Sequence, residues 1–516
     1  MSKALLKSTS MVSSMTLLSR IAGFVRDMVT ASLFGATAEF DAFSVAFRIP
    51  NLMRRLFAEG SFAQAFVPVL SEYQQQKSEK DIHHFVNAIA GTLGIVLVIV
   101  TFFGILLAPW LIKLFAPGFS VEGDRYPLAV FMLRITFPYL LLISLTAFFG
   151  AILNTYSRYW VPAFTPIWLN VCMIGAAFGL SPYLHIPITS LAWGVLLAGF
   201  VQLFFQIPFL SKINLMPRPT IGFHDPGVMR VLKLMIPALF GVSVSQINLL
   251  IDTLFASILV VGSVSWLYYS DRLMEFPLGV IGVAISTVIL PHLSRHHAGK
   301  AEKDFSAVID WALRCVLIVG LPAAVMFAVI SGPLLSTLFQ RGHFDAYAVT
   351  MARKSLSMFA LGIAPFMLIK ILAAGFYARQ DMRTPVRIGI IAMVSNMIFN
   401  VILVWPFKHA GIALATSLSA MINGGLLFYF LKKRKHFTPR THWNTFGLRL
   451  ILSNVILAVW LWLASGDLNA WINHNTSWRL LHLTELMISS GVIYLGALWL
   501  LGMRLKHILI PHEVGV

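Results

Sequence analysis

Apolar runs recur along this 516-residue chain from one end to the other. Each run approaches the length of about 20 residues with which an α-helix crosses a bilayer. Proline, glycine and charged clusters separate the runs, as at Ala116-Pro117-Gly118 and Lys432-Lys433-Arg434-Lys435. The pattern predicts an all-α polytopic membrane protein with about fourteen transmembrane helices. The expected spans are 10–34, 40–70, 86–115, 128–153, 161–181, 187–210, 230–259, 263–292, 306–331, 347–377, 385–405, 410–431, 443–465 and 478–503.

Composition and motifs narrow the functional class. Hydrophobic residues make up 58% of the chain and charged residues 12%, whereas a soluble domain carries about 25% charged residues. The sequence has no nucleotide-binding glycine loop, no HExxH motif and no Ser–His pair in a recognisable motif. We therefore expect a membrane protein that is not an enzyme.

The net charge of +18 is distributed unevenly between alternate loops. One set of loops, with both termini, holds about 23 basic residues, and the other holds about seven. Because loops on the cytoplasmic side retain Lys and Arg, both termini are expected in the cytoplasm. The excess charge serves orientation and contact with anionic membrane lipids, and no nucleic-acid partner is expected.

Three segments in the first half resemble segments about 223–225 residues later. Phe66–Glu72 matches Ile289–Arg295, and Arg158–Pro162 stands at the same offset from Asp381–Pro385. With a small gap, Asp27 and Ala31-Ser32 correspond to Asp252 and Ala256-Ser257. An even number of spans separates the paired segments, so the repeat is parallel, and such transporters bind substrate between their halves. We expect two six-helix lobes around a central cavity, followed by two further helices. The predicted parts are an N-lobe at 1–215, a C-lobe at 216–435 and the last two spans with the tail at 436–516.

Charged residues are concentrated in the first two spans, where each costs roughly 2.5–3.5 kcal/mol at the bilayer centre. They must therefore face water, each other or a ligand. Helical spacing places Arg48, Arg55 and Glu59 on one stripe, with Asn51 and Arg54 on a neighbouring stripe. The full set is Arg20, Arg26, Asp27, Asp41, Arg48, Arg54, Arg55 and Glu59.

The first and eighth spans add further polar positions. Arg20 and Asp27 share a helix face, whereas Arg26 lies about 120° away on an ideal helix. In the eighth span Ser265 and Arg272 share a face, and Asp271 and Glu275 are i,i+4 neighbours.

Two interpretations of these charges stay open. Each charged pair could be an interhelical salt bridge that fixes packing. The guanidiniums of Arg26, Arg54 and Arg272 outnumber the acids near them, however, and a guanidinium fork suits bidentate phosphate binding. We favour a cavity for an anionic, phosphate-bearing substrate.

The second half carries oxygen ligands of the kind that Na⁺ prefers. They are Asp252, Asn396, Asn400 and Thr416, and they could hold a sodium ion if their spans converge. Interhelical hydrogen bonding is the alternative. We expect no other cofactor.

Several motifs together resemble one family. They are Ser19–Asp27, Asp41-Ala42-Phe43, Pro50–Gly60, Gly262–Ser265 with Tyr269–Leu273, and Gly375–Asp381 with Thr384-Pro385. The chain is similar over essentially its whole length to the MurJ (MviN) lipid II flippases, of the multidrug/oligosaccharidyl-lipid/polysaccharide exporter superfamily.

The resemblance implies a substrate and a location. It implies a V-shaped pair of lobes in the bacterial inner membrane, with the last two spans forming a groove for the polyprenyl tail. The substrate would be lipid II, the undecaprenyl-diphosphate-linked peptidoglycan precursor, moved from the cytoplasmic to the periplasmic leaflet by alternating access. We expect a monomer. A flippase for another polyprenyl-linked saccharide and a cation-coupled drug exporter are the alternatives, and a scaffold for cell-wall enzymes is a third.

The resemblance also implies roles for individual residues. Arg26, Arg54 and Arg272 would face the diphosphate and sugar, and an asparagine at 400 stands where some members carry an acid. Residues that would complete or gate the cavity are Arg20, Asn51, Arg55, Asp41, Glu59, Ser265, Asp271 and Glu275, with Asp27 and Arg48 in the same charge network.

Arg54 offers a direct test of the phosphate-binding interpretation. We expect Arg54→Ala to lose lipid II transport in liposomes, and Arg54→Lys or Arg272→Lys to transport poorly because lysine lacks the planar fork. A wild-type rate for Arg54→Ala would contradict the role given to the arginines.

Overall fold

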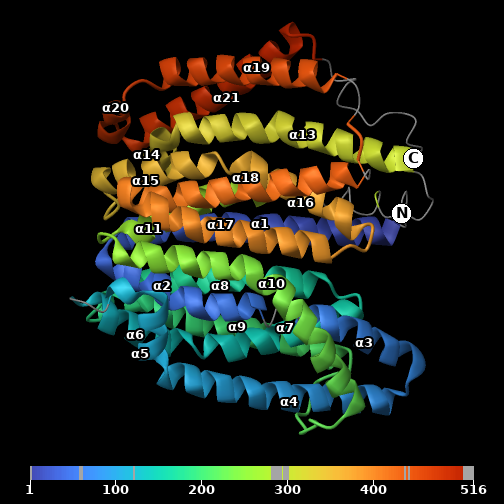
Figure 1. Cartoon of the computed structure of the whole chain (residues 1–516). Coiled ribbons are helices and arrows are strands. Elements are labelled where there is room, and N and C mark those ends of the chain that lie inside the picture. The colour runs from blue at the N-terminus through green and yellow to red at the C-terminus, as the bar shows by residue number, and fades with distance from the viewer. Residues whose placement is uncertain are drawn as a thin grey trace. The chain divides into compact units, whose positions relative to one another are not determined.

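The computed structural model describes residues 3–56, 62–119, 123–279, 293, 302–434, 437–439 and 442–503, and its elements are all helical (Figure 1). The chain divides into two compact units, an N-terminal unit (Met1–Ser265) and a C-terminal unit (Trp266–Val516). The first contains α1 (Lys3–Phe34), α2 (Ala38–Arg54), α3 (Ala63–Gln76), α4 (Glu79–Leu106), α5 (Ala108–Phe115), η2 (Pro117–Phe119), α6 (Arg125–Thr136), α7 (Tyr139–Thr155), α8 (Trp160–Gly179), η3 (Ser181–Tyr183), α9 (Thr189–Lys212) and α10 (Pro226–Ile258). Helix α11 (Ser263–Pro277) begins in the first unit and ends in the second. The second continues with α13 (Glu302–Val329), α14 (Ser331–Phe339), α15 (Ala346–Ala360), α16 (Ile363–Tyr377), α17 (Arg383–Phe407), α18 (His409–Lys433), α19 (Trp443–Ser465), α20 (Leu468–Asn473) and α21 (Thr476–Leu500).

The prediction of a multi-pass helical membrane protein is confirmed. Among the described residues, 10 helical stretches are long and apolar enough to cross a membrane, and each overlaps an expected span. The other expected spans contain α1, α2 with α3, α10 and α11. These four include the spans in which the sequence concentrates charge, and the total of fourteen stays a prediction.

Besides the span that contains α2 and α3, three expected spans are each built from two helices. The span at 128–153 is interrupted between Thr136 and Tyr139, where Pro138 lies, and the span at 86–115 is interrupted at Leu107, before Pro109. Proline removes a backbone donor and its ring clashes with the preceding turn, so a helix ends or restarts there. The third, at 347–377, changes from α15 to α16 after Ala360.

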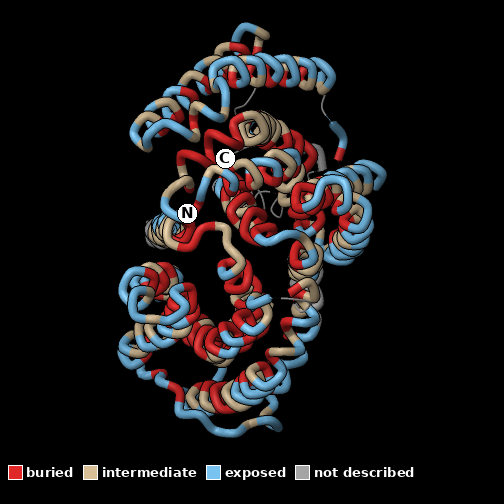
Figure 2. The backbone as a smooth tube through the Cα atoms, turned by 90° about the vertical axis from the view of Figure 1, so that its left-hand side faces the viewer, coloured by how far each residue is buried: buried red, intermediate tan, exposed pale blue. Residues whose placement is uncertain are grey.

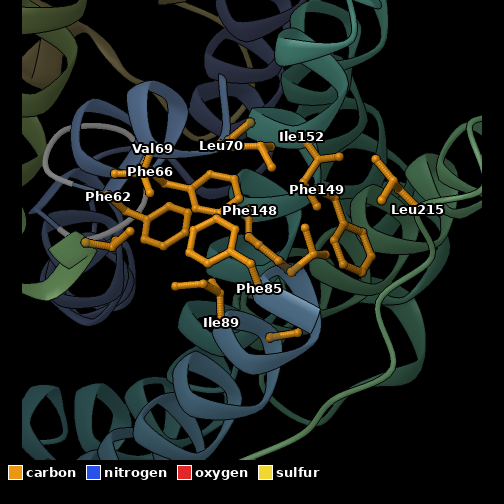
Figure 3. Packing of buried hydrophobic residues seen from close by; sticks show 14 of the residues in the cluster. Phe62, Phe66, Val69, Leu70, Phe85, Ile89, Phe148, Phe149, Ile152 and Leu215 are labelled. Carbon is orange, nitrogen blue, oxygen red and sulfur yellow. The ribbon is translucent and has the colours of Figure 1, made fainter. Parts of the chain in front are cut away.

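Buried aromatic side chains hold the N-terminal unit together. Phe66 of α3 packs against Phe62, Phe148 and Phe85, at ring-centre distances of 5.1, 5.3 and 5.7 Å (Figure 3). Offset and edge-on aromatic pairs of this kind add roughly 0.5–1.5 kcal/mol each beyond the area they bury. Buried and exposed stretches alternate along many of the helices, which gives these helices an inward and an outward face (Figure 2).

The order of helices in the first half recurs in the second. Eight helices of the described residues have a counterpart that starts about 220–225 residues later. This helix order agrees with the internal repeat, although the segment Ile289–Arg295 lies outside the described residues except for Leu293. The parallel relation of the copies stays a prediction. The pairs are α1 and α10, α2 and α11, α4 and α13, α5 and α14, α6 and α15, α7 and α16, α8 and α17, and α9 and α18.

The repeat extends to backbone geometry at one turn. After α7, Ser157 adopts φ 60°, and after α16, Gln380 adopts φ 61°. In both turns the next residue closes a six-residue loop, through Arg158 N to Leu153 O (2.8 Å) and Asp381 N to Phe376 O (3.1 Å). This is the Schellman geometry that terminates helices, which usually places glycine at the left-handed position.

The segment between α9 and α10 is attached to the side of α4. Thr220 N donates to Asn87 O at 3.0 Å, and Arg218 N donates to Asn87 Oδ1 at 2.6 Å. A Cβ on Gly91 would lie 2.1 Å from Thr220 O, so only glycine allows this approach. The segment that joins the two copies of the repeat is therefore bound to the first copy.

Helices α19 and α21 pack on each other and on α13 and α14. Trp443 Nε1 donates to Asp310 Oδ1 at 2.6 Å, and Tyr494 Oη donates to Ile318 O at 2.6 Å. The buried Arg479 guanidinium donates to Ser336 O at 3.0 Å. These three bonds attach α19 and α21 to α13 and α14 at separate points along the helices. Their outward faces expose large apolar side chains, among them Val455, Val459, Trp462, Leu481, Ile488 and Val492.

The two left-handed turns yield a prediction about stability. A non-glycine residue with φ near +60° is strained by roughly 1–2 kcal/mol. Substitution by glycine relieves this strain, but only part of the relief adds to the stability of the fold because glycine is more flexible when unfolded. We expect Ser157→Gly and Gln380→Gly each to raise the melting temperature of the detergent-purified protein. Ala374→Gly, inside α16, is the control and should lower it. A lower melting temperature for both turn variants would contradict the assignment.

Candidate functional site

Arg26 and Asp27 of α1 form a buried ion pair that is fixed to α8. Arg26 Nη2 and Nε lie 2.6 and 3.1 Å from Asp27 Oδ1, and Arg26 Nη1 donates to Asn170 Oδ1 at 3.1 Å. Asn170 Nδ2 in turn donates to Ser19 O at 3.3 Å. Arg26 and Asp27 are 6% and 3% exposed, so this pair also fixes how α1 packs on α8.

Helical spacing had separated Arg26 from Asp27, but the arginine side chain is long enough to reach back to its neighbour. The sequence prediction did not include Asn170. The available signal was an amide in the middle of the apolar run at 161–181, where a polar group needs a partner. Arg20, one turn and a half earlier on α1, is half-buried.

Asp41, near the start of α2, caps the start of α11. Its carboxylate is 0% exposed and accepts hydrogen bonds from Gly262 N at 2.7 Å and Ser265 N at 2.9 Å. The Ser265 hydroxyl donates to the same carboxylate. A carboxylate at a helix N-terminus satisfies otherwise unpaired N–H groups and complements the helix dipole. The structure thus brings together two predicted site residues, Asp41 and Ser265.

The end of α2 holds the other predicted arginines of the first lobe. Arg54 Nη2 and Nε donate to Asn51 Oδ1 at 2.9 and 3.0 Å, as their i,i+3 spacing suggested. Arg48 donates to the hydroxyl of Thr253 on α10, and Arg55 is half-buried. Glu59, the expected partner of Arg55, lies outside the described residues.

In the C-terminal unit Arg272 lies between an acid and an aromatic ring. Its Nη1 is 3.0 Å from Glu275 Oε2, and its guanidinium carbon is 5.1 Å from the centre of the Tyr268 ring. The Arg272 side chain is 28% exposed, so it is less enclosed than Arg26. Asp271, which spacing had placed beside Glu275, is half-buried.

Three of the four predicted sodium ligands form a hydrogen-bonded chain. Asn400 Nδ2 donates to Asn396 Oδ1 at 2.9 Å, and Asn396 Nδ2 lies 3.4 Å from Thr416 Oγ1. Both asparagines are 0% exposed. These contacts join α17 to α18, the arrangement that interhelical hydrogen bonding requires, while their side-chain oxygens keep the donor chemistry that suits Na⁺. Asp252 is half-buried on α10, in the other unit.

The Asp41 cap predicts how two substitutions should combine. In Asp41→Asn an amide NH₂ would face backbone donors, and leaving buried polar groups unpaired costs about 1–3 kcal/mol. We expect Asp41→Asn to lower the melting temperature more than Ser265→Ala, and the double variant to lose less than the sum because the two residues share one bond. Additive losses would contradict that bond.

Comparison with known proteins places this geometry in a family. The family model described as "Lipid II flippase MurJ" matches residues 30–482. The chain is 48% identical over 514 residues to the "Probable lipid II flippase MurJ" of Vibrio cholerae, covering 98% of both chains. It is 40% identical to the "Lipid II flippase MurJ" of Burkholderia cenocepacia, covering 96% of both.

Solved structures agree in fold. The chain aligns with "Lipid II flippase MurJ, inward closed conformation" at a TM-score of 0.80 and 27% identity, over 94% of this chain and 97% of that one. An inward-facing transporter of the multidrug MATE family aligns at 0.70 with 12% identity, a likeness of fold alone. Over most of its length, in sequence as well as fold, the chain belongs to the MurJ lipid II flippase family.

Proposed function

We propose that this protein is a lipid II flippase that supplies peptidoglycan synthesis. The observation that carries the proposal is the family match across residues 30–482. Transport needs no covalent change in the substrate, which agrees with a chain built from apolar helices around a few charged side chains. Lipid II would move from the cytoplasmic to the outer leaflet of the bacterial inner membrane, with both termini of the monomer in the cytoplasm.

Three arginines are assigned to the diphosphate headgroup in this proposal. Arg54 and Arg272 are only half-buried, so they can exchange their present contacts for phosphate at low cost. Arg26 is buried against Asp27 at 2.6 Å and would have to leave that carboxylate to reach a ligand. We therefore propose that Arg54 and Arg272 contact the headgroup first. Arg26 would engage later, with Arg20, Asn51, Arg55 and Ser265 completing the cavity.

The lipid tail and the driving force belong to the same proposal. The exposed apolar faces of α19 and α21 would lie along the polyprenyl tail while the headgroup crosses. Sodium coupling through Asp252, Asn396, Asn400 and Thr416 is proposed on the chemistry of their oxygens, since sodium prefers hard oxygen ligands.

A leaflet assay tests the function directly. Purified protein in liposomes that contain labelled lipid II should transfer the headgroup from one leaflet to the other, and Arg272→Gln should slow transfer by about tenfold or more because a charged hydrogen bond to phosphate is lost. Arg387→Gln, which removes an exposed arginine at the start of α17, is the matched control and should transfer normally. Folded protein that moves no lipid II would contradict the proposal. Preferential transfer of another polyprenyl-linked saccharide would favour the alternative substrate.

A further inference from the structure

The buried carboxylate of Asp41 depends on α11 for its hydrogen bonds. Gly262 N and Ser265 N, at 2.7 and 2.9 Å, are backbone donors at the start of that helix. A fully buried carboxylate that loses its donors without replacement is strongly destabilised. A conformation in which the start of α11 withdraws is therefore stabilised by any second partner that reaches Asp41.

Arg125, the first residue of α6, is placed to be that partner. Its Nη1 lies 4.0 Å from Asp41 Oδ2, and its side chain is 15% exposed. Because charged N–H···O bonds span about 2.7–2.9 Å, the guanidinium is close to Asp41 but does not yet hydrogen-bond to it. Arg125 thus faces Asp41 from the side of α6 while α11 holds the hydrogen bonds.

The position of Arg125 is supported by its surroundings. Its guanidinium carbon lies 4.7 Å from the ring centre of Phe119, a fully buried residue of η2. The same short helix is attached to α10, since Gly118 N donates to Ser257 Oγ at 3.3 Å. Arg125 is therefore held on a braced surface, and a shift of roughly 1 Å would bring it into bonding distance of Asp41.

We propose that Arg125 is a positioning residue that takes over the Asp41 carboxylate when the start of α11 withdraws. The inference rests on the proposed function, because alternating access moves the two units and α11 belongs to both. The planar guanidinium can replace two backbone donors with two parallel hydrogen bonds. Arg125 then stabilises the withdrawn state, so that Asp41 is paired in both states and can change partners without an unpaired intermediate.

A simpler role for Arg125 predicts the opposite effect. If the ion pair only braces the arrangement described here, then removing Arg125 loosens the cap and α11 withdraws more often. If Arg125 receives the carboxylate, then removing it penalises withdrawal. The sign of the change in the exposure of α11 separates the two.

Ser263 supplies the reporter for this experiment. It is the first residue of α11, it is 0% exposed, and its hydroxyl makes no hydrogen bond within the described part of the chain. A Ser263→Cys protein, with Cys172→Ala and Cys315→Ala to remove the native thiols, should react with a maleimide only when the start of α11 opens. The labelling rate is measured on purified protein in detergent, without lipid II.

We expect Arg125→Gln to slow labelling about fivefold or more, the lower range of typical coupling between two-state elements. Arg125→Lys should slow it less, since lysine keeps the charge without the fork. Lys113→Gln, which removes an exposed cation next to Trp110 on the neighbouring α5, should leave the rate unchanged. Faster or unchanged labelling in Arg125→Gln would overturn the proposal. If that variant does not fold, faster or unchanged labelling in Arg125→Lys would do so.

A second arm tests whether Arg125 acts through Asp41. In an Asp41→Asn background the further change Arg125→Gln should alter labelling little, and a full additional effect would overturn the proposal. In liposomes Arg125→Gln should lower the maximal transfer rate with unchanged lipid II affinity, because the residue contacts Asp41 rather than the headgroup. If the reporter variants label as expected but wild-type protein moves no lipid II, the proposed function is refuted and the Arg125 exchange still stands.

Discussion

A charged side chain inside a bilayer costs roughly 2.5–3.5 kcal/mol unless it meets a partner, and several helices of this protein carry such residues. In the described structure these charged side chains have partners, and several of the contacts connect two helices. Arg26 and Asp27 bind each other and then Asn170, which fixes α1 against α8. Asp41 binds the start of α11, which fixes where that helix begins. The charges therefore determine how helices pack as well as what they could bind.

The same pairs bear on the order in which the proposed ligand contacts would form. A guanidinium that touches a carboxylate must give up that bond to bind an anion, as Arg26 would with Asp27. Arg54 is half-buried and donates to the Asn51 amide oxygen at 2.9 Å. Arg272 lies between these cases, with Glu275 at 3.0 Å but a partly exposed side chain. If these arginines bind the headgroup as proposed, each would do so at a cost set by the contacts that it has to give up.

Much of the fold was predictable from the sequence, because apolar runs and proline breaks are local signals. The repeat was also visible, from motifs such as Arg158–Pro162 and Asp381–Pro385, and the helix order reproduces it. The start of α4 was expected at 86 but lies at Glu79, because Ser78 and Asp81 form a capping box beyond the apolar run. A polar first turn is invisible to a search for hydrophobic spans.

The sequence predicted many residues of the candidate site, but it predicted fewer of the contacts that those residues make with one another. Spacing on one helix identified Asn51 with Arg54, since both lie within one turn. It could not identify Asn170 as the partner of Arg26, or Ser265 as a donor to Asp41, because those contacts join helices far apart in the chain. Arg272 pairs with Glu275 at i,i+3, which is a neighbour spacing on a helix, whereas the sequence analysis had placed Asp271 beside Glu275.

The segment that follows α9 has a consequence for the length of the connection between the two halves. Its backbone is pinned to α4 at Asn87, and Gly222 N adds a bond to Thr92 Oγ1 at 3.3 Å. The start of α10 is held to the same unit, because Arg230 Nη2 lies 2.8 Å from Glu72 Oε2 of α3. Residues inserted between α9 and Arg218 would therefore bulge into solvent and leave the start of α10 in place.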